Sequence, residues 1–185
     1  MRFTTLIGIW FLAALAAGAL GLVKRLHPPA PQVVLLALTV TLVTAGAFWP
    51  SFRGWLLRLR WQSVVAIHLS RFVGAYFIWL YRRGELPFGF AVPAGIGDLV
   101  TAVLATALLL TAPTVSRRPW LLIAWNVVGL ADILMVVARA ALEGLSDPAS
   151  MMALVRLPLS LLPTFLVPII IASHLLLFQK ARNIR

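Results

Sequence analysis

Cysteine is absent from the 185-residue sequence, and acidic residues are scarce. Disulfides, thiolate metal sites, iron–sulfur clusters and thiol nucleophiles all require cysteine, so the sequence excludes them. The sequence also contains no Gly-x-Ser-x-Gly, no His-Glu-x-x-His and no glycine-rich phosphate loop. Because these motifs define large classes of hydrolases, metalloproteases and nucleotide-binding enzymes, the chain carries no recognised catalytic motif.

Apolar residues are abundant instead, at 62% of the chain, whereas soluble domains contain about 45–50%. They form long runs separated by short clusters of charge, without the alternating segments of roughly ten residues typical of a membrane β-barrel. The pattern predicts an all-α, polytopic integral membrane protein with a single transmembrane domain over residues 1–185. The six predicted spans are residues 4–23, 32–49, 62–81, 88–110, 120–142 and 154–178.

The net charge of +11 comes from basic residues at the ends of the apolar runs. Such residues orient helices and contact anionic lipid, so we expect no nucleic-acid partner. The first run, of about 20 residues, is longer than the apolar region of a signal peptide, and we expect an uncleaved helix. Six spans put both termini on one side, and the positive-inside rule predicts that this side is cytoplasmic. Its nine basic residues are Arg2, Arg53, Arg58, Arg60, Arg117, Arg118, Lys180, Arg182 and Arg185.

Residues 51–61, SFRGWLLRLRW, separate the second and third spans and mix arginine with tryptophan and leucine. This mixture is typical of a short helix at the membrane surface, with tryptophan at the depth of the headgroups and arginine against phosphates. We therefore predict that residues 51–61 anchor the protein in anionic lipids. A docking surface for a partner protein is the alternative.

The fourth span holds a carboxylate at a depth where burying its charge costs free energy. Asp98 lies about ten residues into this span, close to the bilayer midplane. An ionisable group there costs roughly 3 kcal/mol or more unless the protein interior receives it. Segments 95–98 and 129–132 share the pattern Gly-x-small-Asp, and helix rise puts Arg71 and Asp132 in the same layer as Asp98. We predict that these three side chains meet inside the membrane.

Helical periodicity assigns further residues to the interior. Trp125, Asp132 and Arg139 follow steps of three and four along the fifth span, and Asn126 neighbours Trp125. One interpretation is a binding site for a proton, an ion or a polar solute, because charges within membranes are costly and usually functional. The other is a purely structural cluster that holds the helices in register. The candidate binding residues are Arg71, Asp98, Asp132, Asn126, Trp125 and Arg139.

Two histidines suggest a different function. His68 and His174 lie at similar depths on the third and sixth spans, as the two axial ligands of a haem b would. A b-type haem protein or redox-complex subunit is therefore an alternative, and a zinc site completed by a carboxylate is a weaker one. A third alternative is an intramembrane enzyme that uses Asp98 and Asp132 as paired carboxylates.

Residues 86–98, 129–132 and 165–174 together resemble small bacterial polytopic membrane proteins of uncharacterised function. The resemblance covers the chain from Gln62 onward and implies a bacterial inner-membrane protein of about six helices, without a function. We predict a non-enzymatic protein that binds or transports a small solute or proton, or serves as a membrane subunit of a larger complex. At 20.2 kDa the chain is small for a complete transporter, so we expect a homo-oligomer or a partner subunit.

Overall fold

The computed structural model describes residues 3–181, which are mostly helical and contain no strand. This confirms the predicted all-α class. In chain order the elements are α1 (Phe3–Ala19), η1 (Val23–Arg25), α2 (Ala30–Phe48), α3 (Pro50–Arg58), α4 (Trp61–Ala66), η2 (Ile67–Val73), α5 (Gly74–Arg82), α6 (Phe88–Leu110), α7 (Ala112–Arg117), α8 (Trp120–Ser146), η3 (Pro148–Val155), η4 (Leu162–Leu166) and α9 (Val167–Ala181).

Within residues 3–181, five helical stretches are long and apolar enough to cross a membrane: 30–48, 61–82, 88–110, 120–146 and 162–181. Helix α1 is equally apolar but has only 17 residues. It stops at Ala19 because a turn follows, in which Gly21 adopts a φ of +68° that glycine tolerates best. The first predicted span, residues 4–23, is therefore shorter than expected.

The last span also begins later than predicted. Helix α8 continues to Ser146, and residues 148–155 form a 3₁₀ helix rather than a loop leading into a span at residue 154. Asp147 caps this 3₁₀ helix, because its carboxylate accepts hydrogen bonds from the backbone N–H groups of Ala149 and Ser150. A break at residues 156–161 follows, and the final span starts at Leu162.

The third span is not a uniform α-helix. Between α4 and α5 its seven middle residues tighten into the 3₁₀ helix η2, which contains both His68 and Arg71. A 3₁₀ stretch inside a long helix often marks a functional position, because it rotates the side chains relative to an α-helical path. In this chain the rotation presents two buried polar side chains to the neighbouring helices.

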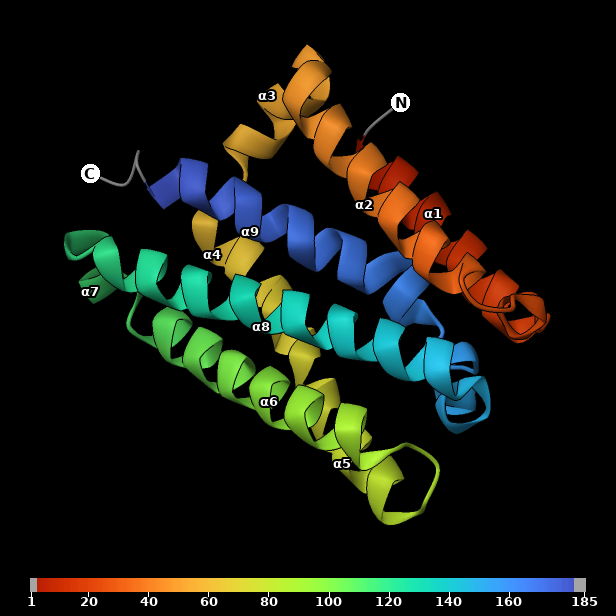
Figure 1. Ribbon diagram of the computed structural model, residues 1–185. Helices are drawn as coiled ribbons and strands as arrows, with labels where there is room; N and C mark the ends of the chain where they lie inside the picture. Colours follow the sequence, from red (N-terminus) through yellow and green to blue (C-terminus); the bar gives the residue numbers. More distant parts are fainter. Residues whose placement is uncertain (1–2, 182–185) are drawn as a thin grey trace.

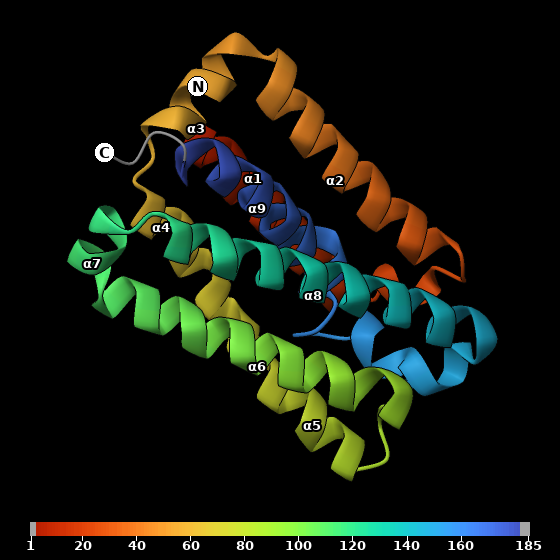
Figure 2. The same ribbon diagram turned by 60° about the vertical axis from the view of Figure 1, so that its left-hand side comes forward.

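The long helices pack in sequence, with α5 against α6, α6 against α8, and α8 against α9. Helix α9 runs between α8 and α2 in both views (Figures 1 and 2), and α1 contacts the π-helical segment η4. Helix α6 lies along one edge of the molecule and contacts η2, α5 and α8.

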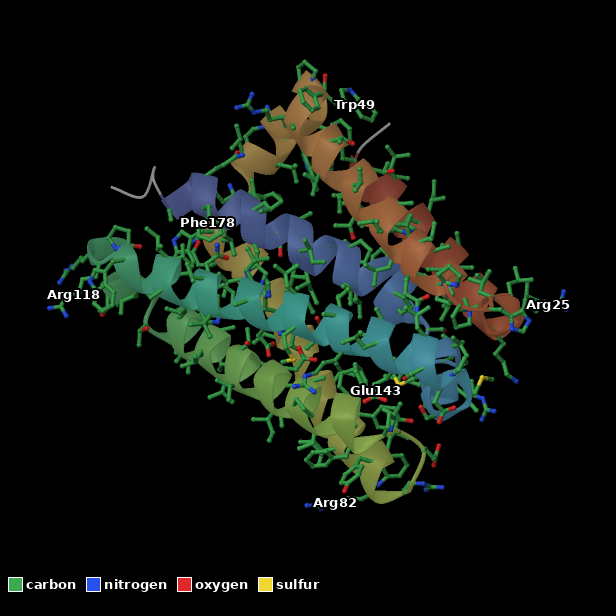
Figure 3. The ribbon with its side chains drawn as sticks, viewed as in Figure 1. Arg25, Trp49, Arg82, Arg118, Glu143 and Phe178 are labelled. Atoms are coloured by element: carbon green, nitrogen blue, oxygen red, sulfur yellow. The ribbon has the colours of Figure 1, made fainter. Side chains whose placement is uncertain are left out.

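Both described ends of the chain lie beside α3. The ring of Phe3 packs 5.1 Å from that of Phe52, and Lys180 Nζ donates to the carbonyl oxygens of Leu57 and Leu59. The basic residue Arg118 lies at one end of the bundle, whereas Arg25, Arg82 and Glu143 lie toward the other (Figure 3).

The helix predicted for residues 51–61 ends before the end of that segment. Helix α3 ends at Arg58, and Trp61 begins α4 as a member of a buried cluster with Leu122 and Leu177. Trp61 therefore belongs to the protein core, and the helix in this region consists of residues 50–58. The apolar neighbours of Trp61 explain the difference, since a large indole ring gains free energy by packing against them.

Candidate functional site

Arg71, Asp98 and Asp132 meet between η2, α6 and α8. Arg71 Nε donates to Asp98 Oδ1 at 2.6 Å, Nη1 donates to the Gly129 carbonyl oxygen at 3.0 Å, and Nη2 donates to Asp132 Oδ2. The side chains of Arg71 and Asp98 are 1% and 5% exposed, and that of Asp132 is 11% exposed. A single guanidinium therefore joins two carboxylates and a backbone carbonyl inside the protein.

Glycines allow these helices to approach closely. A Cβ atom added to Gly95 would lie 2.7 Å from the Gly74 carbonyl oxygen, so the backbones of α5 and α6 touch at this point. Gly97 faces the carboxylate of Asp132, which occupies the space that a Cβ at position 97 would need. The repeated Gly-x-small-Asp pattern thus has a packing role, because the small residues admit the charged side chains.

A second polar layer adjoins this cluster. His174 Nδ1 donates to Asn126 Oδ1 at 2.8 Å, and Asn126 Nδ2 donates to the His174 carbonyl oxygen at 2.9 Å. His68 Nε2 lies 3.0 Å from Ser173 Oγ, and its ring packs edge-on against Trp125. The two layers meet at Gly129, because its carbonyl binds Arg71 while a Cβ there would lie 2.7 Å from His174 Cε1.

The histidine pair does not fit the haem alternative. The ring centroids of His68 and His174 are 4.3 Å apart, with the rings inclined at 55°. Two imidazoles on opposite faces of a haem iron need centroids about 6 Å apart, because each nitrogen lies about 2 Å from the metal. No porphyrin can pass between rings that touch in this way. Residues 3–181 also contain no group of three His, Asp or Glu side chains placed to hold a metal ion, so the zinc alternative finds no ligand set.

Two of the predicted binding residues have other partners. Trp125 is buried, but its indole Nε1 donates to the Thr101 carbonyl oxygen at 3.1 Å and does not contact the carboxylates. Arg139 is exposed and donates to the Gly89 carbonyl oxygen at 2.8 Å. Gly89 lies nine residues before Asp98 on α6, so Arg139 lies about 13 Å along the helix from the cluster. Arg139 is therefore not part of this site.

Other polar residues of the site were not predicted. Ser173 binds His68, and Thr101 is 1% exposed with its Oγ1 unpartnered. Within the described residues His68 Nδ1 and His174 Nε2 are buried and unpartnered as well. Serine and threonine in apolar helices give no sequence signal of their own, because each usually bonds to its own helix backbone. Their burial beside the histidines is the only feature that identifies them.

A cavity of about 480 Å³ reaches the cluster. Ser70, Arg71 and Asp98 lie at its inner end, and Lys24, His27 and Gln32 line it near η1 and the start of α2. Most of the remaining wall is apolar and comes from α2, α8, η3 and the final span. Arg71 and Asp98 are thus accessible to a guest molecule although the surrounding helices bury them.

Comparison with known protein families gives one match. A family model described as a domain of unknown function (DUF8737) matches residues 28–182. The chain belongs to this family. The DUF8737 region includes the second to sixth predicted spans and thus extends further toward the N-terminus than the resemblance noted from Gln62 onward. Arg71, Asp98, Asp132 and both buried histidines lie within it. No curated protein and no solved structure matches the chain.

The charges of the cluster limit its chemistry. With both carboxylates ionised the three side chains carry a net charge of −1, and with one proton or one monovalent cation bound they are neutral. A guanidinium has five N–H donors, and three atoms of Arg71 each use one of them here. The cluster of this DUF8737 protein therefore combines a proton-accepting carboxylate with unused hydrogen-bond donors.

Proposed function

We propose that this protein binds an exchangeable proton at the Arg71–Asp98–Asp132 cluster and couples it to the binding or transport of a small solute in a membrane. The observation that carries the proposal is the pairing of two carboxylates with one guanidinium deep within the helices. Uncompensated charge costs several kcal/mol in such an environment, so the neutral, singly protonated cluster is strongly favoured over the anionic one.

The cavities support a functional role beyond helix packing. The cavity beside α2 and α8 ends at Arg71 and Asp98, so one face of the cluster is open to a guest. A further cavity of about 430 Å³ between α1, α2, α3 and α9 reaches Ser173, the partner of His68. The buried polar layers therefore adjoin open space on two sides. A purely structural ion-pair cluster needs neither cavity.

We place the protein in a bacterial inner membrane, with six crossings and both termini in the cytoplasm. Helix α1 would provide the sixth crossing, and the positions of Phe3 and Lys180 beside α3 support termini on one side. Basic residues 53, 58, 60, 117 and 118 would then face the cytoplasm. Helix α3 would lie at the headgroups against anionic lipid, and the small chain would act as a homo-oligomer or with a partner subunit.

Infrared titration of the purified protein in lipid nanodiscs tests proton binding directly. A protonated buried aspartate has a carboxylic-acid C=O band that is resolved from the amide bands. We expect this band at neutral pH with an amplitude of about one proton per chain, because the coupled pair shares one proton, and we expect it to disappear at alkaline pH. Asp98→Asn and Asp132→Asn should each change or remove it.

The control for this titration is Glu85→Gln. Glu85 pairs with Arg83 at the protein surface, where both side chains are about half exposed, and its removal should leave the buried-acid band unchanged. A band that persists unaltered in both aspartate variants, or that never appears while the protein remains folded, would contradict the proposed function. The cluster would then serve only to hold η2, α6 and α8 together.

A further inference from the structure

The cavity beside α2 and α8 adjoins exposed apolar residues of α2 as well as the cluster. Leu36 of α2 lines the cavity and is 61% exposed, and its neighbour Val33 is 58% exposed. Residues on the lipid-facing surface of a transmembrane helix contact hydrocarbon. A guest dissolved in the bilayer would therefore reach Arg71 and Asp98 between α2 and α8.

The walls of the cavity match an apolar chain. Leu35, Val136 and Ile170 contribute aliphatic side chains from three different helices, and Met151 and Met152 contribute flexible thioethers from η3. Methionine adapts to irregular apolar guests, because its unbranched side chain repacks at low cost. Burying such a chain in this cavity leaves no polar wall group unpaired along most of its length.

The inner end matches a polar group that both accepts and donates hydrogen bonds. Arg71 Nη1 and Nη2 each use one hydrogen toward protein acceptors, which leaves a second hydrogen on each nitrogen. Asp98 binds Arg71 through Oδ1, so its Oδ2 can accept a hydrogen bond. A hydroxyl group satisfies both partners, and a carbonyl oxygen satisfies the guanidinium.

The charge balance of the cluster favours an uncharged ligand end. Arg71 is already paired with two carboxylates, so an anionic head group would face their repulsion. A cationic head group would face the guanidinium and would have to displace the proton that neutralises the cluster. Either charge would also be removed from water without a free counter-charge, which is costly in a membrane interior.

We infer that the solute is a membrane-dissolved amphiphile with an apolar chain and an uncharged hydroxyl or carbonyl end, which enters between α2 and α8 and places that end at Arg71 and Asp98. This inference rests on the proposed function, because it names the ligand class of the same site. Chain alcohols and prenylated quinones share this chemistry, and competition between them identifies the source.

Photolabelling of the wild-type protein in nanodiscs tests the inference. The probe is hexadecanol with a diazirine in its chain, and the comparison probe carries a methyl group in place of the hydroxyl. We expect labelled peptides from the start of α2, the second half of α8 and η3. The hydroxyl probe should label them about tenfold more strongly than the methyl probe, as expected for one hydrogen bond to a charged group. Excess farnesol or decylubiquinone should compete for this labelling.

Two substitutions on α8 provide a matched pair. Ala141 lines the cavity and Ala138, one turn earlier, is exposed. Ala141→Phe should fill the cavity and reduce labelling about tenfold, whereas Ala138→Phe should leave it unchanged. Val137→Phe offers a second cavity-filling variant if Ala141→Phe does not fold. Labels spread evenly over all lipid-facing helices, or equal labelling by both probes, would overturn the inference.

The infrared titration separates the two proposals. A buried-acid band in a wild-type protein that the hydroxyl probe does not label at the cavity would preserve the proposed function and reject this ligand class. Specific labelling of a protein whose carboxylates never protonate would retain the amphiphile site and reject proton coupling.

Discussion

Replacing Arg71 with methionine is expected to destabilise the protein more than any other single substitution of a polar residue at the site. Arg71 is 1% exposed and holds both Asp98 and Asp132. Its removal would leave two carboxylates in the interior without a cation, and breaking a buried pair in this way costs about 3–5 kcal/mol. The measurement is reversible unfolding in mixed detergent micelles, followed by circular dichroism.

The control for this prediction is Arg139→Met on α8. Arg139 is exposed and donates only to the Gly89 carbonyl oxygen, so its replacement should cost no more than about 1 kcal/mol. The combined variant Arg71→Met, Asp98→Asn and Asp132→Asn should recover much of the lost stability, because it removes all three charges together. An Arg71→Met protein as stable as the parent would show that the cluster is not the ionic core described here.

Substituting valine for Gly95 is expected to have the second-largest effect. Even a Cβ atom at this position would lie 2.7 Å from both the Gly74 carbonyl oxygen and Ile78 Cγ1. The first of these is backbone, which cannot rotate away as a side chain can. Helix α6 would have to move from α5, and we expect a loss of about 2–3 kcal/mol together with displacement of Asp98 from Arg71.

Gly8→Ala serves as the comparison for Gly95→Val. Gly8 lies within α1 and has no atom within 4 Å of an added Cβ, so alanine there should be neutral or stabilising by about 0.5–1 kcal/mol. Both variants are measured by unfolding in micelles, and the infrared titration of Gly95→Val reports whether the cluster survives. Wild-type stability in Gly95→Val would mean that α5 and α6 are not in backbone contact.

We propose that the Arg71–Asp98–Asp132 cluster binds a proton and is reached laterally from the membrane. The apolar cavity would select for molecules that are already dissolved in the bilayer, and binding or release of one proton would switch the cluster between a net charge of zero and −1. Such a combination suits a protein that moves, senses or modifies the protonation of an amphiphile.

Much of the site was predictable from residue types and depth. Three charged residues interrupt otherwise apolar runs, namely Arg71, Asp98 and Asp132. A helix rise of about 1.5 Å per residue puts all three in one layer. Arg139 follows the same helical stripe as Asp132 but lies two turns further along α8, where its long side chain reaches the surface. Periodicity predicts which face of a helix a residue occupies, whereas joining a cluster also requires the right position along the helix axis.

The arrangement of the two histidines, by contrast, could not be predicted from depth. The sequence gives His68 and His174 similar depths, which is compatible with either haem ligation or direct contact. Only the packing of η2 against α9 decides between them, by bringing the ring centroids to 4.3 Å. That spacing also depends on Trp125 and Gly129, which approach the two histidines from a third helix. Their positions in the sequence do not reveal these contacts.

By itself the sequence determined that the protein is all-α, which segments are apolar enough to cross a membrane, and that Arg71, Asp98 and Asp132 share one buried layer, because these properties follow from local hydrophobicity and helix rise. The tertiary structure alone decided the start of the last span at Leu162, the absence of Arg139 from the cluster, and the cavity between α2 and α8. The physical reason is that helix rotation and spacing arise from contacts between distant residues, such as Gly74 with Gly95, which no local pattern records.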